Sequence, residues 1–420
     1  MSSLVHSVAQ FLTAACTTVL SIEAVAQPAP VLPSGLTIQQ AVRIAAEQRD
    51  EIRAARFRIQ GAEARPQIVS ALADPMVAPA IDHKPFMMSG ADISVSLEQQ
   101  IPLSRIRGHR RAAAVADLAR VTADAARTTL DVELQAASAF LMLQERRRTA
   151  ALLLEQIAFA REVVGAANAR YANGTTPQSD VLRAELEVAR LEASSRAIIS
   201  EVRGAEAMLN ASLARPADTV VPSLALLILS DSIPTWERVK GALAMRPELV
   251  AGQAEISRAD ADVLVMRDMY RPMATIRSGL ASTMAEGRGW MTMVGISLPI
   301  WRTRLRAGVT EAQAMRAMSV ADLQAMRRMI EGDAAGAVNQ LQAWRDRQQS
   351  LGDNVLPRAR MAIAPVVAGY AAGRLPLVSV IESVQALWSV QSALITADAE
   401  VGLAWARLGR AIGSYEALRR

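Results

Sequence analysis

The side chains that most often carry out chemistry are few in this sequence and lie far apart. It contains one cysteine, Cys16, and three histidines, His6, His83 and His109. Zinc motifs place such residues close together, so the spacing predicts no metal site and no disulfide. The sequence also lacks a phosphate-binding loop, a nucleophile elbow and a dinucleotide-binding fingerprint. We therefore expect no catalytic residue, no cofactor and no enzymatic activity.

Methionine is the one chemically distinctive residue type, with 18 copies in the chain. Seven of them lie in or beside strand-like runs: Met76, Met87, Met88, Met273, Met284, Met291 and Met293. Thioethers are soft ligands that suit Cu(I) and Ag(I). Methionine is also a common apolar filler, and on a strand one of two adjacent residues must face away from the other.

The composition indicates long helices packed through small side chains. Of 420 residues, 51% are hydrophobic but only 4% are aromatic, and alanine is abundant. That balance is typical of extended helical packing and not of an aromatic-rich core. The net charge of +5 is spread along the chain, so no concentrated basic face predicts a nucleic-acid partner.

The N-terminus has the features of a secretory signal peptide, which we predict for residues 1–26. An apolar stretch, residues 8–20, precedes the small-x-small tripeptide at residues 24–26, although no Lys or Arg stands before it. Lipidation of Cys16 is the alternative, and Thr13 disfavours it because a lipoprotein signal usually has Leu there. No later segment offers 18 uncharged apolar residues, so we expect no transmembrane helix.

A tandem duplication organises the rest of the chain. The pattern Y-A-x-G-x-x-P-x-x-x-V-[LI] occurs at residues 171–182 and again 199 residues later, at 370–381. Two further matches lie 197 residues apart: 49–52 with 246–249, and 101–103 with 298–300. Ordered matches at a nearly constant offset predict two repeats. The predicted divisions are an extension at 27–35, a first repeat at 36–214, a linker at 215–233, a second repeat at 234–413 and a tail at 414–420.

Both repeats have the same expected order of elements. In the first we expect a helix at 37–71, strands at 75–86 and 91–101, and helices at 103–171 and 178–213. In the second we expect a helix at 235–268, strands at 273–284 and 290–298, and helices at 301–370 and 377–412. Short loops at 87–90 and 285–289 should connect each pair of strands.

The longest helices are the first indication of function. About 68 residues at roughly 1.5 Å each span on the order of 100 Å, which no compact domain needs. We expect the second long helix to be interrupted or kinked, because it contains two prolines and three glycines: Pro357, Pro365, Gly332, Gly336 and Gly352. By themselves these helices would suit a soluble coiled coil equally well.

The strands favour a membrane. Ile93, Val95 and Leu97 alternate with polar residues, and the run 290–301 has about the 9–11 residues that cross a bilayer as a tilted strand. Aromatic residues at strand ends predict interfacial girdles: Phe86, Tyr270, Trp290 and Trp301. The alternative is an ordinary hairpin packed on the helices, with both tryptophans in the core.

Four strands cannot close a barrel, and an open strand edge is not tolerated in lipid. Several copies of the chain must therefore share one barrel. Two copies would supply eight strands and three would supply twelve, and the residues alone do not choose between them.

These parts resemble the TolC-like outer membrane factor family, also called outer membrane efflux proteins, over residues 36–413. The resemblance rests on the duplicated turn, the junctions at 101–103 and 298–300, and the repeat length. It implies a mostly α protein with a small β part. It also implies a homotrimer with a shared twelve-stranded barrel in the outer membrane and a long helical coiled-coil barrel through the periplasm. The implied partners are a periplasmic adaptor protein and an inner-membrane pump.

The resemblance also implies where the functional residues lie. The two turns should form the periplasmic tip that meets the adaptor, with these residues: Tyr171, Gly174, Pro177, Asp180, Tyr370, Gly373, Arg374 and Pro376. Asp180 and Arg374 are candidates for contacts that hold the tip closed, and the alternative, which has the stronger prior, is that both are solvated surface charges. Glu382 is a candidate for a carboxylate ring at the aperture, while Ser379 stands where an acid is expected.

We therefore predict a passive export duct of the outer membrane. Its cargo is expected to be metal ions such as copper or silver, ahead of other small molecules, because residues 74–76 and 290–293 resemble the family's heavy-metal branch (CusC- and CzcC-like). The alternatives are a soluble coiled-coil scaffold and a periplasmic adaptor. An adaptor would need lipoyl-like segments, which the sequence lacks.

Overall fold

The computed structural model describes residues 32–82, 92–226, 233–283 and 287–413, and residues 32–420 form one unit. The predicted signal peptide, Cys16, Phe86, the loop at 87–90 and the tail at 414–420 lie outside the described residues. The first half contains α2 (Ile38–Gln48), α3 (Asp50–Ser70), β1 (Met76–Asp82), β2 (Asp92–Pro102), α4 (Ile106–Ala172) and α5 (Gln178–Ser212). The second half contains α6 (Trp236–Leu243), α7 (Pro247–Asp268), β3 (Met273–Thr283), β4 (Gly287–Ser297), α8 (Arg302–Gln349), a π-helix η1 (Ser350–Val355), α9 (Leu356–Ala371) and α10 (Leu377–Ile412).

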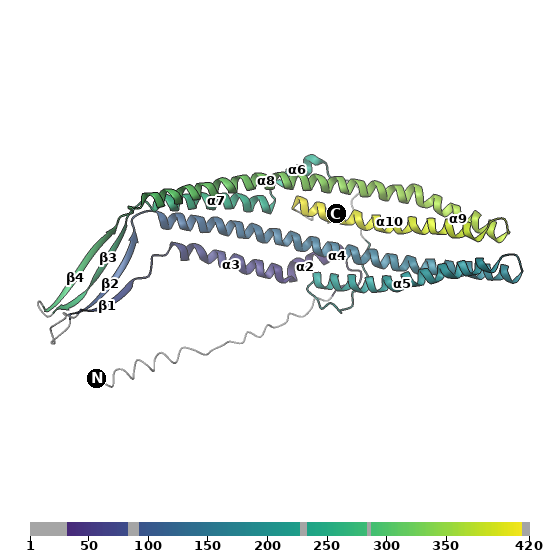
Figure 1. The fold of residues 1–420 in the computed structure, drawn as a ribbon, viewed down its shortest axis with the longest axis horizontal. Helices are drawn as coiled ribbons and strands as arrows, with labels where there is room; N and C mark the ends of the chain where they lie inside the picture. Colours follow the sequence, from purple (N-terminus) through teal and green to yellow (C-terminus); the bar gives the residue numbers. More distant parts are fainter. Residues whose placement is uncertain (1–31, 83–91, 227–232, 284–286, 414–420) are drawn as a thin grey trace, which may run out of the picture. The chain divides into compact units, whose positions relative to one another are not determined.

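The two halves repeat one order of elements (Figure 1), but the predicted helices at 37–71 and 235–268 are wrong as continuous helices. The first breaks at Arg49 and the second ends at Leu243, resuming after Arg246. Both arginines have extended backbones, with ψ of 136° and 132°. Each also pairs with a glutamate two residues later, Glu51 or Glu248. The match between residues 49–52 and 246–249 therefore marks the same helix break in each half.

Arg246 closes the C-terminal end of α10. Its side chain is buried, and its Nη1 donates to the carbonyl oxygens of Arg410 and Ala411. Glu248 Oε1 accepts from Arg246 Nη2 and from Arg410 Nη2, at 2.7 Å each. Arg410 Nε also donates to Asp131 of α4, at 2.6 Å. Since terminal helix carbonyls need partners, this network ties α10 to α7 and α4.

The four strands form one antiparallel sheet in the order β1-β2-β3-β4. The halves meet at β2 and β3, where Glu98 lies opposite Arg277 and accepts from its Nε at 2.9 Å. Residues opposite each other share a face, so the register gathers branched apolar side chains on one face, as the alternation predicts. They are Val77, Ile81, Ile93, Val95, Leu97, Ile276, Leu280, Val294 and Ile296.

Strand β4 begins at Gly287, three residues before the predicted start, so Trp290 lies inside the strand and residues 287–289 are not loop. Gly287 and Gly289 were expected in the loop, but they belong to the strand because β3 supplies a partner for each residue from Gly287 to Ser297. The large apolar side chains of the sheet are mostly exposed, including Ile81 and Val294 at 74% and 65%. No helix in the described part of the chain covers them extensively.

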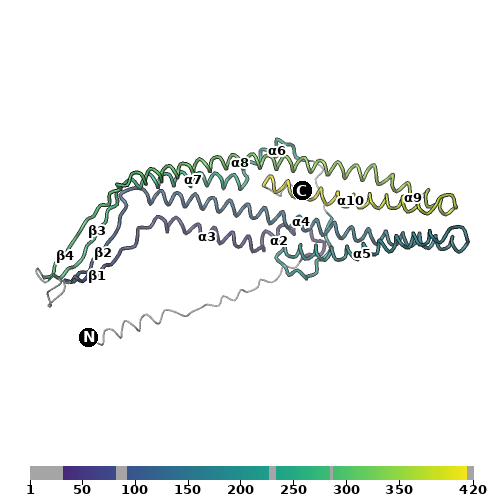
Figure 2. Tube along the Cα trace, in the orientation of Figure 1, coloured from purple at the N-terminus to yellow at the C-terminus, as the bar shows by residue number. Residues whose placement is uncertain are grey.

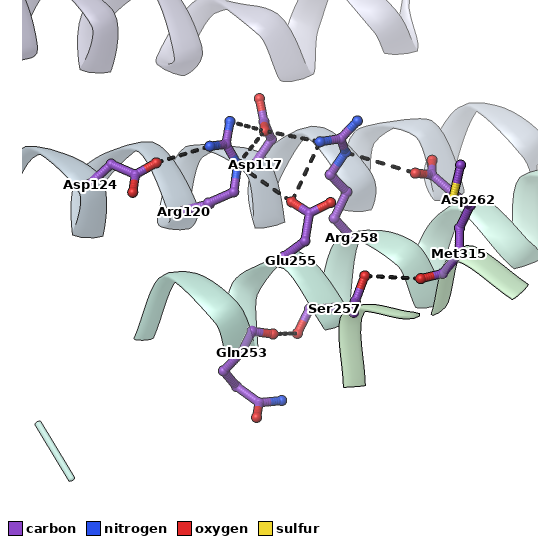
Figure 3. Close-up of polar contacts among 10 residues, drawn as sticks. Asp117, Arg120, Asp124, Gln253, Glu255, Ser257, Arg258, Asp262 and Met315 are labelled. Atoms are coloured by element: carbon purple, nitrogen blue, oxygen red, sulfur yellow. Dashed lines mark hydrogen bonds and ion pairs between the residues drawn. The ribbon is translucent and has the colours of Figure 1, made fainter. Parts of the chain in front are cut away.

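The helices pack side by side, α3 on α4, α4 on α7 and α7 on α8, while α5 packs on α4 and α10 packs on α4 and α8 (Figure 1). An ion network joins α4 to α7 (Figure 3). Arg120 binds Asp117 at 2.9 Å and Glu255 at 3.5 Å, and Arg258 binds the same two carboxylates at 3.6 and 3.5 Å. The two halves of the chain therefore contact each other through α4 with α7 among the helices as well as through β2 with β3 in the sheet.

The long helices differ as predicted. Helix α4 runs without interruption for 67 residues, whereas its counterpart passes through the π-helix between α8 and α9. The offset between the halves grows from 197 residues at the strand-to-helix junctions to 199 at the turns. The second long segment therefore holds two additional residues. A π-helix accommodates extra residues because its hydrogen bonds span five residues instead of four.

One described helix, α10, is long and apolar enough to cross a membrane by length and composition. The expectation of no transmembrane helix rested on the lack of 18 uncharged apolar residues in a row, whereas α10 qualifies although charged residues such as Glu382 and Asp398 interrupt it. In the structure α10 packs along α4 and α8 and buries Val401, Trp405 and Leu408.

The Arg246–Glu248 network predicts a pH-dependent stability. Burial raises the pKa of Glu248, but hydrogen bonds from Arg246 and Arg410 outweigh it and hold the pKa at about 2, below its ordinary 4.5. The carboxylate therefore stabilises the fold above about pH 4.5, by on the order of 3 kcal/mol. This contribution is lost as the pH falls toward 2.

We expect Glu248→Gln to lower the Tm at about pH 6 and to reduce the further loss between pH 5 and pH 3. Glu237→Gln, at an exposed residue of α6, is the control and should leave both quantities unchanged. Circular dichroism melts at fixed protein concentration measure them. An unaltered pH profile in Glu248→Gln would contradict the assignment.

Candidate functional site at the helical turns

The two helical turns have the same backbone geometry. Gly174 and Gly373 both have positive φ, of 67° and 74°. Each glycine N–H donates to the carbonyl of the preceding tyrosine three residues earlier, Tyr171 or Tyr370, at 2.9 Å. Glycine suits this reversal because other residues are strained at positive φ. Pro177 and Pro376 then stand at the N-caps of α5 and α10.

The side chain of Arg170 links the two turns, which lie next to each other at the same end of the helices (Figure 2). Its guanidinium lies 4.7 Å from the centroid of the Tyr370 ring and donates to the Tyr370 carbonyl oxygen. It also donates to the carbonyl of Thr175 in its own turn, at 3.3 Å. One cationic side chain thus binds both turns through a cation–π contact and two carbonyl oxygens.

An apolar cluster holds the same two hairpins together above the turns. Its buried members are Ala167, Val181, Ala184, Tyr370, Leu377, Val380 and Val384. Phe159 and Trp388 meet edge to face there, with centroids 6.4 Å apart. Burial raises the pKa of the Tyr370 phenol, so this ring is neutral at physiological pH. The Arg170 link therefore lies at the margin of a packed interface.

The predicted tip residues occupy both turns, but the link between them comes from a residue that the sequence analysis did not select. Asp180 accepts from Thr176 Oγ1 at 2.6 Å, within its own hairpin. Arg374 and Glu382 are exposed, and Ser379 is half-buried. Arg170 could have been noticed as the charged residue before the duplicated tyrosine, where the second repeat has Gly369.

The predicted girdle residues in the described part of the chain lie at the surface. Trp290 and Trp301 are 70% and 71% exposed, so the alternative that places both in a core is wrong. Tyr270 is half-buried, and the guanidinium of Arg302 lies 5.6 Å from its ring centroid. Phe86 lies outside the described residues.

The turn geometry predicts opposite effects of alanine at two glycines. Gly373→Ala should destabilise the fold by about 1–2 kcal/mol, because alanine is strained at a φ of 74°. Gly165→Ala, inside α4 where a Cβ meets no atom within 4 Å, should stabilise it by roughly 0.5–1 kcal/mol. Thermal unfolding measures both. Equal shifts in the two variants would contradict the turn assignment.

The sequence and the fold are similar to those of known proteins. Residues 239–414 match the family described as outer membrane efflux protein. The outer membrane efflux protein BepC of Brucella suis biovar 1 is 25% identical over 291 residues, 67% of this chain and 63% of BepC. The cobalt-zinc-cadmium resistance protein CzcC of Cupriavidus metallidurans is 23% identical over 374 residues, 86% of this chain and 87% of CzcC.

Among solved structures, the outer-membrane channel OprN superposes with a TM-score of 0.79 at 16% identity, covering 90% of each chain. At that identity the likeness shows a shared fold. The fold, the duplicated turns and the sequence matches confirm the resemblance that the sequence predicts: the chain is similar to outer membrane efflux proteins, whose family model matches residues 239–414, and it has a TolC-like fold.

Proposed function

We propose that the protein is the outer membrane channel of a tripartite efflux system, a passive duct from the periplasm to the exterior with no enzymatic role. The uncovered four-stranded sheet carries this proposal. One face of the sheet is apolar and exposed, both edges are open, and its strands continue into helices on the order of 100 Å long. A soluble scaffold would not expose an apolar face of this kind to water.

The open edges call for further copies of the chain. Unpaired backbone groups of β1 and β4 cannot remain in lipid, so β4 of one copy must pair with β1 of the next. Three copies, as the family resemblance implies, supply twelve strands and a closed barrel. The branched face would then contact lipid, and Trp290 and Trp301 would lie at the interfaces.

Helices α3 and α8 each carry an exposed stripe, and we call the proposed contact between these two stripes the seam. In α3 the buried residues face α4, while the opposite stripe is exposed and uncharged: Ala54, Phe57, Gly61, Ala64 and Ile68. In α8 an exposed stripe has similar spacing: Ala307, Glu311, Ala314, Met318, Ala321 and Ala325. Because α3 leads into β1 and α8 follows β4, the copy that closes the sheet brings these two stripes together.

The levels along the seam also correspond. Phe57 lies 13 residues before the end of α3, and Ala314 and Met318 lie 12 and 16 residues after the start of α8. Phe57, which is 60% exposed in the single chain, would insert between Ala314 and Met318 as a knob into a hole. Glu311, the one charge on the α8 stripe, would face the basic flank of α3 that includes Arg58 and Arg65.

At the other end, the two turns would form the periplasmic tip and the closed gate. The adaptor protein would dock on the exposed parts of both turns, and the inner-membrane pump would supply the energy. Arg170 binds the two hairpins to each other, so opening requires this link to break while the apolar cluster shifts.

Metal ions are the cargo that we favour. CzcC, which matches this chain over 87% of its own length, is named for cobalt, zinc and cadmium resistance. The methionine-rich strands point to metal ions as well.

The assembly is tested by fractionation, mass determination and cysteine cross-linking. In a Cys16→Ser background the chain has no other cysteine. We expect Phe57→Cys combined with Ala314→Cys to form disulfide-linked dimers and trimers on oxidation, in protein from the outer-membrane fraction. Phe57→Cys with Gln313→Cys is the control, because residue 313 lies on another face of α8. A soluble monomer would overturn the proposal, and equal cross-linking of both pairs would overturn the seam.

The gate is tested by Arg170→Ala. Loss of the link should raise the open probability and mean conductance of trimers in planar bilayers, while Arg183→Ala, at an exposed arginine of α5, should match the wild type. Arg170→Lys keeps the charge but loses the planar stacking on Tyr370, so it should give an intermediate value. Wild-type conductance in Arg170→Ala would show that the link does not hold the tip closed.

A further inference from the structure

The methionines of the sheet are distributed unequally between its two faces. Met76 lies opposite Glu98, Glu98 opposite Arg277, and Arg277 opposite Met293, so these four residues form one row on one face. Met273 and Met291 lie on the same face, since each is an even number of residues from a member of the row on its own strand. All four methionines in the described strands therefore share a face, and it is the face without the branched apolar residues.

This placement is the reverse of what apolar partition predicts. Leucine, isoleucine and valine occupy the face that would contact lipid, and thioether side chains of similar hydrophobicity are absent from that face in the described strands. The methionines stand instead beside Ser94, Ser96 and Glu98, and Met291 and Met293 are about half exposed, at 47% and 46%. This argument rests on the proposed function, which makes the polar face the wall of a water-filled bore.

We propose that the inner wall of the barrel binds soft monovalent cations, Cu(I) or Ag(I), through Met291 and Met293 of one copy and Met76 of the next. Met291 and Met293 are two residues apart on one face, so their Cα atoms are about 6.6–6.8 Å apart. Their unbranched side chains can bring both sulfur atoms to one ion. Met76 and Met293 stand at opposite ends of the row, on the two open edges. Joining β4 to the next β1 brings them toward each other.

The row favours soft cations over divalent ions that prefer oxygen and nitrogen ligands. Its single carboxylate, Glu98, is already paired with Arg277, so the centre of the row carries no net charge. The remaining donors are neutral thioethers, which bind Cu(I) and Ag(I) better than Zn(II) or Co(II). Few neutral ligands make a weak site, and a duct needs weak sites because its cargo must leave again.

The test uses detergent-solubilised trimers of the full chain in the Cys16→Ser background, with Ag(I) as the probe. Bound silver is measured by equilibrium dialysis and elemental analysis, with Zn(II) in parallel. The Met291→Leu/Met293→Leu variant keeps the apolar volume but removes two sulfur atoms per copy. We expect its silver affinity to fall at least about tenfold. Removing a residue that only hydrogen-bonds to a metal ligand already costs about tenfold, and this variant removes the ligands themselves.

The matched control is Met208→Leu/Met361→Leu on α5 and α9, which removes two exposed thioethers outside the sheet. Silver affinity that falls in the strand variant alone, with Zn(II) binding unchanged, supports the inference. Equal silver binding by wild type and strand variant overturns it, and so does an equal loss in both variants. The mass of the detergent particle is a separate readout. If no trimer forms, the proposed function fails, whereas a trimer that binds no silver overturns only this inference.

Discussion

The pairing of β2 with β3 is the constraint on which the rest of the structure depends. It joins the two halves of the chain, and Glu98 and Arg277 hold its register. Because β2 runs into α4 and α7 runs into β3, the same pairing sets α4 beside α7, where Arg120 and Arg258 bind carboxylates of both helices. Once β2 with α4 and β3 with α7 are joined as the inner elements, α3 with β1 and α8 with β4 become the outer ones. Both outer pairs leave an exposed helix stripe and an unpaired strand edge.

The features that could be predicted from the sequence are those with local causes. Gly174 and Gly373 predict turns because glycine adopts positive φ without strain. Ile93, Val95 and Leu97 predict a strand because the alternation of apolar and polar residues can be read from adjacent residues. The interruption of the second long helix was likewise predicted from its own glycines and prolines. These signals fixed the order of elements in both halves and led to the fold.

The features that were missed have causes far away in the chain. The role of the Arg246 side chain depends on the end of α10, more than 160 residues later, whose carbonyls accept from it. Arg170 acts on Tyr370, which is 200 residues away. The common face of the strand methionines depends on pairings between strands from different halves. In each case the residue type was visible in the sequence, but its partner became known only from the three-dimensional arrangement.

The π-helix makes the two long helical segments unequal in their hydrogen bonding. In a regular helix two added residues would turn everything beyond them by about 200°, and α9 would present the wrong side to α10. The wider π turn takes up part of that rotation, and both halves keep the same turn at their ends. It also replaces hydrogen bonds that span four residues with bonds that span five, in a segment whose residues are not buried. The first hairpin thus contains one continuous α-helix and the second an α–π–α segment, so the duplicated sequence does not produce two identical hairpins.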